Sequence, residues 1–242
     1  MTHIDASQLD YRQLNAAIRD CAGDVAVTGC LGQRFIGAGR GHDRLTITGT
    51  PGNALGAYLD GACIEVRGDA QDAVCATMTA GRIIVHGSIG DAAGYAMRGV
   101  ELYVAGNAGY RAGIHMKAYG DKLPVMVIGG RAGSFLGEYQ AGGIIIVLGL
   151  TDGSRPIVSN FPCTGMHGGK LFLRSDCRDI LFPGQVVARP AVQDELREIE
   201  PYLHTFCRLF GGRCDALLRH PFTVVTPNSS DPYRQLYVTN CM

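Results

Sequence analysis

The side chains that carry nucleophilic and acid–base chemistry are spread along this sequence instead of being gathered in a motif. The chain has nine cysteines and seven histidines among its 242 residues. No two cysteines have the Cys-x-x-Cys spacing, and no histidines have the His-Glu-x-x-His or His-x-His spacing of metal sites. The Gly-x-Ser-x-Gly elbow of serine hydrolases is also missing. The sequence therefore predicts no catalytic residue, and no metal or cofactor bound by this chain itself.

Cys163 and His167 are the two residues whose types and spacing come nearest to a catalytic pair. They lie four residues apart in the segment CTGMHGG. A histidine between glycines can titrate near neutrality, and a neighbouring histidine can activate a thiol. Two interpretations stay open: an independent enzyme that uses this segment, or a loop that closes the last turn of a repetitive fold. We favour the loop, because proximity in sequence does not bring two side chains into contact.

Overall charge and cysteine usage narrow the class of protein and the compartment. Lys and Arg total 22, as do Asp and Glu, so the net charge is zero and general nucleic-acid binding is disfavoured. The amino terminus has no apolar core of signal-peptide length, and the longest apolar run, Ile144–Leu148, is too short to span a membrane. The cysteines are odd in number and widely spaced, which is typical of reduced thiols. We expect a cytoplasmic protein without nucleic-acid or membrane partners.

Glycine is unusually frequent, at 34 of 242 residues, and it recurs with a period of about nineteen. A glycine follows each short apolar segment, and others fall three and seven residues later. The glycines at the start of each unit are Gly29, Gly49, Gly68, Gly87, Gly106, Gly130 and Gly149. Those at the later offsets include Gly52, Gly56, Gly90, Gly94, Gly109, Gly113, Gly133 and Gly137. Self-similarity at a fixed period is the signature of a stacked repeat.

Apolar residues keep the same register as the glycines. Two alternate positions before each starting glycine hold apolar pairs such as Val25/Val27, Leu45/Ile47 and Ile145/Val147. Alternation of this kind indicates short strands with one buried face, which become stable when they stack on equivalent neighbours. The sequence predicts an all-β fold, a single-stranded right-handed parallel β-helix of about seven coils of ~19 residues.

The glycines are better explained as corners of coils than as a phosphate-binding loop, because a phosphate motif occurs once and this pattern occurs seven times. One unit departs from the pattern: Gln71 and Cys75 replace glycines in the unit that starts at Gly68. We interpret this unit as sequence drift. A longer unit carries extra residues in the stretch 117–124, which we expect to form an inserted surface loop.

Helices are expected at both ends of the β-helix, where they would cover unpaired strand edges. We divide the chain into a helical cap at 1–22, a β-helix at 23–175, and a helix and tail at 176–242. Residues 7–21 read as a helix that starts at Ser7 with a capping-box-like pattern to Asp10. Residues 192–210 read as an amphipathic helix, in which Pro201 predicts a kink or two short helices.

One outward face of the predicted strands becomes apolar toward the carboxyl-terminal coils. Acidic residues at outward positions, Glu65 and Glu101, are expected in surface ion pairs. An apolar outer face suggests contact with another subunit. The successive outward positions include Glu65, Ile84, Tyr103, Val127 and Ile146.

The glycine repeat resembles the GXGXG domain, the carboxyl-terminal β-helix of the glutamate synthase large subunit. The segments 165–174 (GMHGGKLFLR), 222–227 (FTVVTP) and 232–237 (PYRQLY) look like the closing coil and tail of stand-alone, archaeal-type subunits. The resemblance covers roughly residues 20–240. It transfers no catalytic position, because Met1 is followed by Thr2 instead of a catalytic cysteine and the close-spaced cysteines of an iron–sulfur motif are missing.

The resemblance implies a non-catalytic assembly subunit of an oxidoreductase complex that makes glutamate from glutamine and 2-oxoglutarate. The implied partners are a glutaminase and a synthase subunit, and the implied FMN and iron–sulfur cluster would be bound by those partners. Formation of a homo-oligomer is also open. An alternative is a scaffold in another redox complex, because one of the subunits of formylmethanofuran dehydrogenase shares the repeat. The Cys163/His167 enzyme is the remaining alternative.

Overall fold

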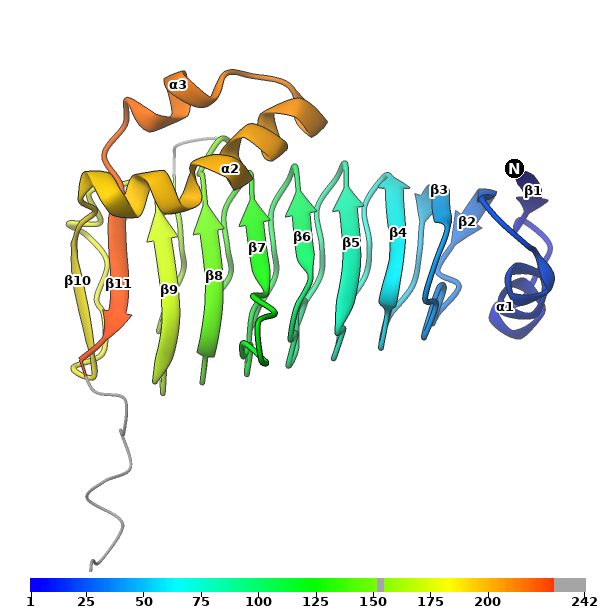
Figure 1. Ribbon diagram of the computed structural model, residues 1–242, viewed down its shortest axis with the longest axis horizontal. Coiled ribbons are helices and arrows are strands. Elements are labelled where there is room, and N and C mark those ends of the chain that lie inside the picture. Colours follow the sequence, from blue (N-terminus) through cyan, green and yellow to red (C-terminus); the bar gives the residue numbers. More distant parts are fainter. Residues whose placement is uncertain (152–154, 229–242) are drawn as a thin grey trace, which may run out of the picture.

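The computed structural model of the chain describes residues 1–151 and 155–228, and these form one elongated stack of strands with helices at one end and along one side (Figure 1). The strands are β1 (Thr2–Asp5), β2 (Val25–Leu31), β3 (Arg44–Thr50), β4 (Asp60–Arg67), β5 (Ala80–Val85), β6 (Glu101–Val104), β7 (Val125–Ile128), β8 (Ala141–Val147), β9 (Gly168–Leu173), β10 (Val186–Pro190) and β11 (Thr223–Pro227). The helices are α1 (Tyr11–Asp20), α2 (Gln193–Phe210) and α3 (Cys214–Leu218).

The described strands form one sheet in which β1 to β9 are parallel and follow the order of the sequence. Each turn of the chain places one strand beside the strand before it, so the architecture is a parallel β-solenoid, as predicted. The solenoid has about eight turns, one more than the predicted seven. The additional turn ends at β9, which the chain reaches only after a long interruption in the glycine period. The predicted insertion at 117–124 is a surface turn whose Tyr119 and Lys122 pair with each other.

The interior of the solenoid is a column of aliphatic side chains in register. Leu45 pairs with Ile64, Ile64 with Ile83, and Ile83 with Leu102, and the column continues through β7, β8 and β9. All of these side chains are fully buried. Burial of each side chain contributes about 1.5–3 kcal/mol, and the parallel register of the strands is what brings these side chains into one column.

The glycines lie where one turn approaches the backbone of the turn before it. A Cβ at Gly61 would overlap the carbonyl oxygen of Gly41, and a Cβ at Gly49 would overlap that of Cys30. Both glycines also have φ in the left-handed region, 136° and 120° respectively. Glycine is the one residue type that tolerates both this backbone conformation and such a short approach.

Polar side chains form hydrogen bonds between the corners of successive turns, which the sequence did not predict. Asp69 accepts a hydrogen bond from the backbone N–H of Ser88 at 2.7 Å, and the Ser88 hydroxyl accepts one from Asn107 at 3.0 Å. In a second row, the Asp72 carboxylate accepts a hydrogen bond from the backbone N–H of Asp91. The Asp91 carboxylate accepts one from the backbone N–H of Tyr110 in the next turn. Each acceptor satisfies a backbone donor at a corner, where the strand ladder has ended.

The amino-terminal end differs from the predicted helical cap, because it also contains a strand. Residues of β1 pair in parallel with β2 and so extend the sheet by one strand. Helix α1 starts later than predicted: Asp10, and not Ser7, is its N-cap, accepting from the N–H of Gln13 at 2.8 Å. The Gln13 side chain accepts in return from the N–H of Asp10. The reciprocal box works from Asp10 because the glutamine lies three residues after it.

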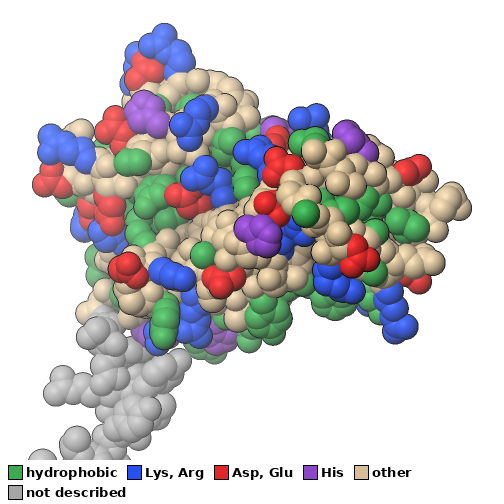
Figure 2. Space-filling view, turned by 45° about the vertical axis from the view of Figure 1, so that its right-hand side comes forward, with side chains coloured by type: hydrophobic (Ala, Val, Ile, Leu, Met, Phe, Trp, Pro, Cys, Tyr) green, Lys and Arg blue, Asp and Glu red, His purple; other side chains and the backbone are tan. Residues whose placement is uncertain are grey.

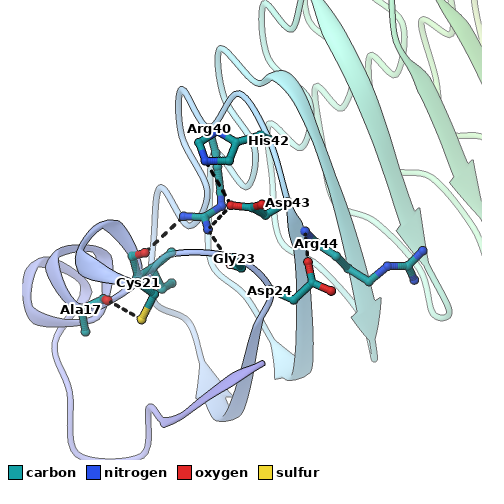
Figure 3. A network of polar contacts seen from close by, with 9 residues as sticks. Ala17, Cys21, Gly23, Asp24, Arg40, His42, Asp43 and Arg44 are labelled. Atoms are coloured by element: carbon teal, nitrogen blue, oxygen red, sulfur yellow. Dashed lines mark hydrogen bonds and ion pairs between the residues drawn. The ribbon is translucent and has the colours of Figure 1, made fainter.

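Arg40 fixes α1 to the first corner of the solenoid (Figure 3). Its guanidinium donates to the carbonyl oxygens of Ile18 and Gly23, each at 3.1 Å, and pairs with Asp43 at 3.3 Å. The side chain of Arg40 is mostly buried. This contact ties the carboxyl end of α1 to a turn that is distant in sequence.

The apolar outer face of β6 to β9 is covered by the chain's own helices, so the expected subunit contact at this face was wrong. Helix α2 runs crosswise to these strands (Figure 1). Its Leu203 and Phe206 are buried in one cluster with the outward side chains of the sheet, among them Tyr103, Val127 and Ile146. The helix is one continuous element through Pro201, so the alternative of two short helices was wrong. The apolar face of α2 therefore packs on the sheet of its own chain.

The carboxyl-terminal end of the solenoid is closed by strands and not by the predicted helix. Strand β11 pairs with β9 in the antiparallel direction, and β10 pairs with β11. The Thr223 hydroxyl also donates to the carbonyl oxygen of Ser175 at 2.7 Å. Reversing strand direction ends the parallel stack and occupies the free edge of β9. The tail segment 232–237 lies outside the described residues.

Candidate functional site

Cys163 lies in the interior of the solenoid and is fully buried. Its backbone N–H donates to the carbonyl oxygen of Leu136 at 2.8 Å, a contact that repeats at the same corner of other turns. Burial raises the pKa of the Cys163 thiol well above its ordinary value. A thiol that holds its proton and has no access to solvent is a poor nucleophile.

His167 belongs to the loop that leads into β9. Its ring Nδ1 lies 3.0 Å from the carbonyl oxygen of Gly165, and its backbone N–H donates to Gln140 at 2.9 Å. The buried side-chain amide of Gln140 donates to the carbonyl oxygens of Gly142 and Gly143. These contacts describe a closing loop, and the burial of Cys163 removes the nucleophile that the enzyme alternative needs.

The acidic residues singled out in the sequence form surface ion pairs, as expected. Glu65 pairs with Arg44 at 3.0 Å and with His86 at 3.1 Å. Glu101 receives a hydrogen bond from Arg82 at 2.8 Å. Across residues 1–151 and 155–228, no three His, Cys, Asp or Glu side chains come together in a way that can hold a metal ion.

The feature that distinguishes the surface is a stripe of aromatic side chains along one corner of the solenoid. Tyr110 contacts Phe135 with ring centroids 5.4 Å apart, and Phe135 contacts Phe161 at 5.2 Å. Beside them, His115 stacks on Tyr139 at 5.1 Å. We call the full set the aromatic stripe: Tyr95, Tyr110, His115, Phe135, Tyr139 and Phe161.

Repetition of one backbone shape explains why these rings line up. Phe135, Gly137 and Tyr139 all have left-handed φ, at 61°, 65° and 52°, with one residue between successive members. The same alternation recurs in the other turns, for example at Arg111 and His115. A left-handed non-glycine residue costs about 1 kcal/mol, so the corner sequence is under strain that stacking between turns must offset.

The aromatic stripe is packed against the Arg111 side chain and remains partly open to solvent. The Arg111 guanidinium lies 4.8 Å from the Tyr110 ring centroid and 5.5 Å from that of Phe135. Arg111 Nε also pairs at 2.7 Å with the buried carboxylate of Glu138. Phe161 is nevertheless 59% exposed and Tyr110 38% exposed. Exposed, pre-ordered aromatic rings lose little entropy on binding and are the residues that dominate protein interfaces.

Sequence reasoning missed the aromatic stripe because it followed the glycines and the apolar pairs. Part of the signal was present: Phe135 and Tyr139 lie five and nine residues after Gly130, and His115 lies nine residues after Gly106. On the face drawn in Figure 2, basic and acidic side chains are interspersed, with hydrophobic side chains showing between them. That mixture fits the zero net charge and gives no large patch of one sign on this face.

These features define a class of protein: a glycine-cornered parallel β-solenoid that carries an exposed aromatic stripe and two covering helices. The chain belongs to the GXGXG motif family, which matches residues 10–227. Uncharacterized protein MJ1350 of Methanocaldococcus jannaschii is 42% identical over 253 aligned positions, which cover 99% of this chain and 97% of the relative. No helix within the described residues is long and apolar enough to cross a membrane.

Proposed function

We propose that this chain is a non-catalytic assembly subunit of a glutamate synthase-type oxidoreductase complex in the cytoplasm. Membership of the GXGXG motif family supports this proposal, because that repeat is the one that resembles the β-helix of glutamate synthase. The observation that carries an assembly role is the aromatic stripe, a set of mutually packed and partly exposed rings on a chain whose Cys163 is buried.

The proposed partners are a glutaminase subunit and a synthase subunit. FMN and an iron–sulfur cluster would be bound by the synthase subunit, and this chain would hold the two catalytic subunits at a fixed separation. A solenoid suits that task, because turns that contact only their neighbours make a long, stiff surface. The zero net charge fits a surface that meets other proteins.

The experiment is purification of the tagged full chain from its native cells, followed by identification of the bound proteins and assay of glutamine-dependent glutamate synthesis. Partners with glutaminase and FMN domains, and activity only in the complex, are expected. Partners with a molybdopterin or tungsten cofactor would favour the alternative redox complex instead. Turnover by the isolated chain would contradict every scaffold role.

A triple variant tests whether the aromatic stripe holds the partners. Tyr110→Ser, Phe135→Ser and Phe161→Ser together remove its central rings. We expect loss of the co-purifying subunits with retained secondary structure. The matched control is Tyr58→Ser, which removes a ring that is 66% exposed and lies outside the stripe. Equal recovery of partners with both variants would mean that assembly uses a different surface.

A further inference from the structure

A cavity rich in arginine lies at the corner that follows β7, β8 and β9. Its volume is about 410 Å³, within the range of sites for small molecules. Among the described residues, its lining includes the arginines Arg131, Arg155, Arg174 and Arg178 and the acids Asp176 and Asp179. Arginine is thus the most frequent charged residue of the described lining, although the whole chain is neutral.

Arg174 is the lining residue best suited to hold a ligand, because its guanidinium is partly buried and only one of its nitrogens has a hydrogen bond in the described residues. Its Nε donates to the carbonyl oxygen of Leu148 at 2.6 Å, which fixes the plane of the group. Within the described residues, its two terminal nitrogens have no protein acceptor. Burial lowers the pKa of Arg174 from its ordinary value, which is the sign of a cation deprived of water. An anion at the two free nitrogens would replace that lost solvation.

The other lining groups are held in place around Arg174. Asn107 accepts a hydrogen bond from the backbone N–H of Arg131 at 2.8 Å and from the Thr151 hydroxyl at 3.0 Å, so one side chain ties two walls of the cavity together. On the opposite wall, Arg178 pairs with Asp176 at 3.0 Å and is 83% exposed at the rim. The cavity is thus built from the ends of three separate turns.

We propose that this cavity binds the phosphate group of a small phosphorylated molecule. The oxygens of a phosphate group suit the planar fork that Arg174 presents, and the other arginines make the described lining mainly basic. The volume leaves room for a small molecule attached to that group. None of the described residues that line this cavity belongs to the aromatic stripe, so a test of phosphate binding is independent of a test of the assembly role.

The test is isothermal titration calorimetry of the full chain with inorganic phosphate, at constant ionic strength and pH 7.5. We expect saturable binding with a dissociation constant below about 1 mM. Arg174→Gln should weaken it about tenfold or more, because hydrogen bonds to charged groups are the strong class. Arg197→Gln, which removes an exposed arginine of α2 outside the cavity, is the matched control and should leave the affinity unchanged.

Two further arms keep the outcome decisive. If Arg174→Gln does not fold, Arg178→Gln replaces it; its exposed position makes it tolerable, and an unchanged affinity would overturn the proposal. Succinate distinguishes a phosphate site from a general carboxylate site. Binding of succinate more tightly than phosphate would overturn the phosphate assignment, as would the lack of saturable phosphate binding to the native chain.

Discussion

Cys163 stands in the corner position that Gly137 occupies one turn earlier. The two residues have φ of 61° and 65°, and each donates its N–H to the turn before it, Gly137 to Ala112 and Cys163 to Leu136. Cys75 takes the same position in an earlier turn, with φ of 64°. The irregular unit that begins at Gly68 therefore has the same backbone as its neighbours. The cysteines at these corners are core residues that replace glycine.

Thiol labelling tests this structural role. Cys75 and Cys163 are fully buried and burial raises the pKa of both thiols, so we expect no reaction with iodoacetamide at pH 8.5 in the native chain. Cys21 and Cys207 are more exposed and should be modified first. Peptide mass spectrometry before and after denaturation in urea reads out each site. Rapid modification of Cys163 in the folded protein would reopen the catalytic alternative.

Replacing a corner glycine tests the stacking of turns. Gly61→Ala places a Cβ against the carbonyl oxygen of Gly41, and φ is 136°. We expect the free energy of unfolding to fall by about 2–4 kcal/mol, because neither backbone can move aside cheaply. Gly184→Ala is the control, since a Cβ there meets nothing within 4 Å. It should change stability by less than about 1 kcal/mol in urea denaturation. Equal stability of the two variants would contradict the packing argument.

The period of nineteen was enough to predict the solenoid, because the same spacing determines both the corners and the buried strand face. The strand pairs Leu45–Ile64 and Ile64–Ile83 lie in the predicted register. The location of α2 was not predictable in this way. Periodicity shows that a helix has an apolar face, but it does not tell which surface that face covers.

The aromatic stripe and the arginine cavity escaped prediction for related reasons. Phe135 and Tyr139 adopt left-handed φ, a conformation found mostly at glycine or asparagine. Their backbone propensities therefore did not predict their positions at the corners. Arg131 and Arg174 are distant in sequence, and only the stacking of turns brings both to one cavity. Strand β1 was missed because its four residues, THID, bury little and mix polar with apolar types.

Helix α2 gives a prediction on the covered outer face. Phe206 is 3% exposed and packs in the cluster between α2 and the sheet. Phe206→Ala should lower the free energy of unfolding by about 3–5 kcal/mol, because it leaves a cavity under the helix. Phe161→Ala removes the same side chain from an exposed site in the aromatic stripe and should cost about 0.5 kcal/mol or less. Similar midpoints for the two variants in urea would argue against an intramolecular role for α2.

Alkaline pH should destabilise the fold through its buried thiols. Burial raises the pKa of Cys30 and of Cys214 from 9.0 to about 11. Between pH 9 and 11 the unfolded chain has already released these protons while the folded chain still holds them, so the free energy of unfolding decreases as pH rises. Below pH 9 these groups are protonated in both states, and their contribution is fully present.

Urea denaturation at pH 8 and pH 10.5, with a reductant present, measures this loss. The variant with Cys30→Ala and Cys214→Ala should lose less stability between the two pH values than the native chain, because two of the titrating thiols are gone. Other buried thiols, such as Cys177, keep part of the pH dependence, since burial raises the pKa there too. Identical losses in the native chain and the variant, or a gain in stability with pH, would show that these thiols are solvated in the folded protein.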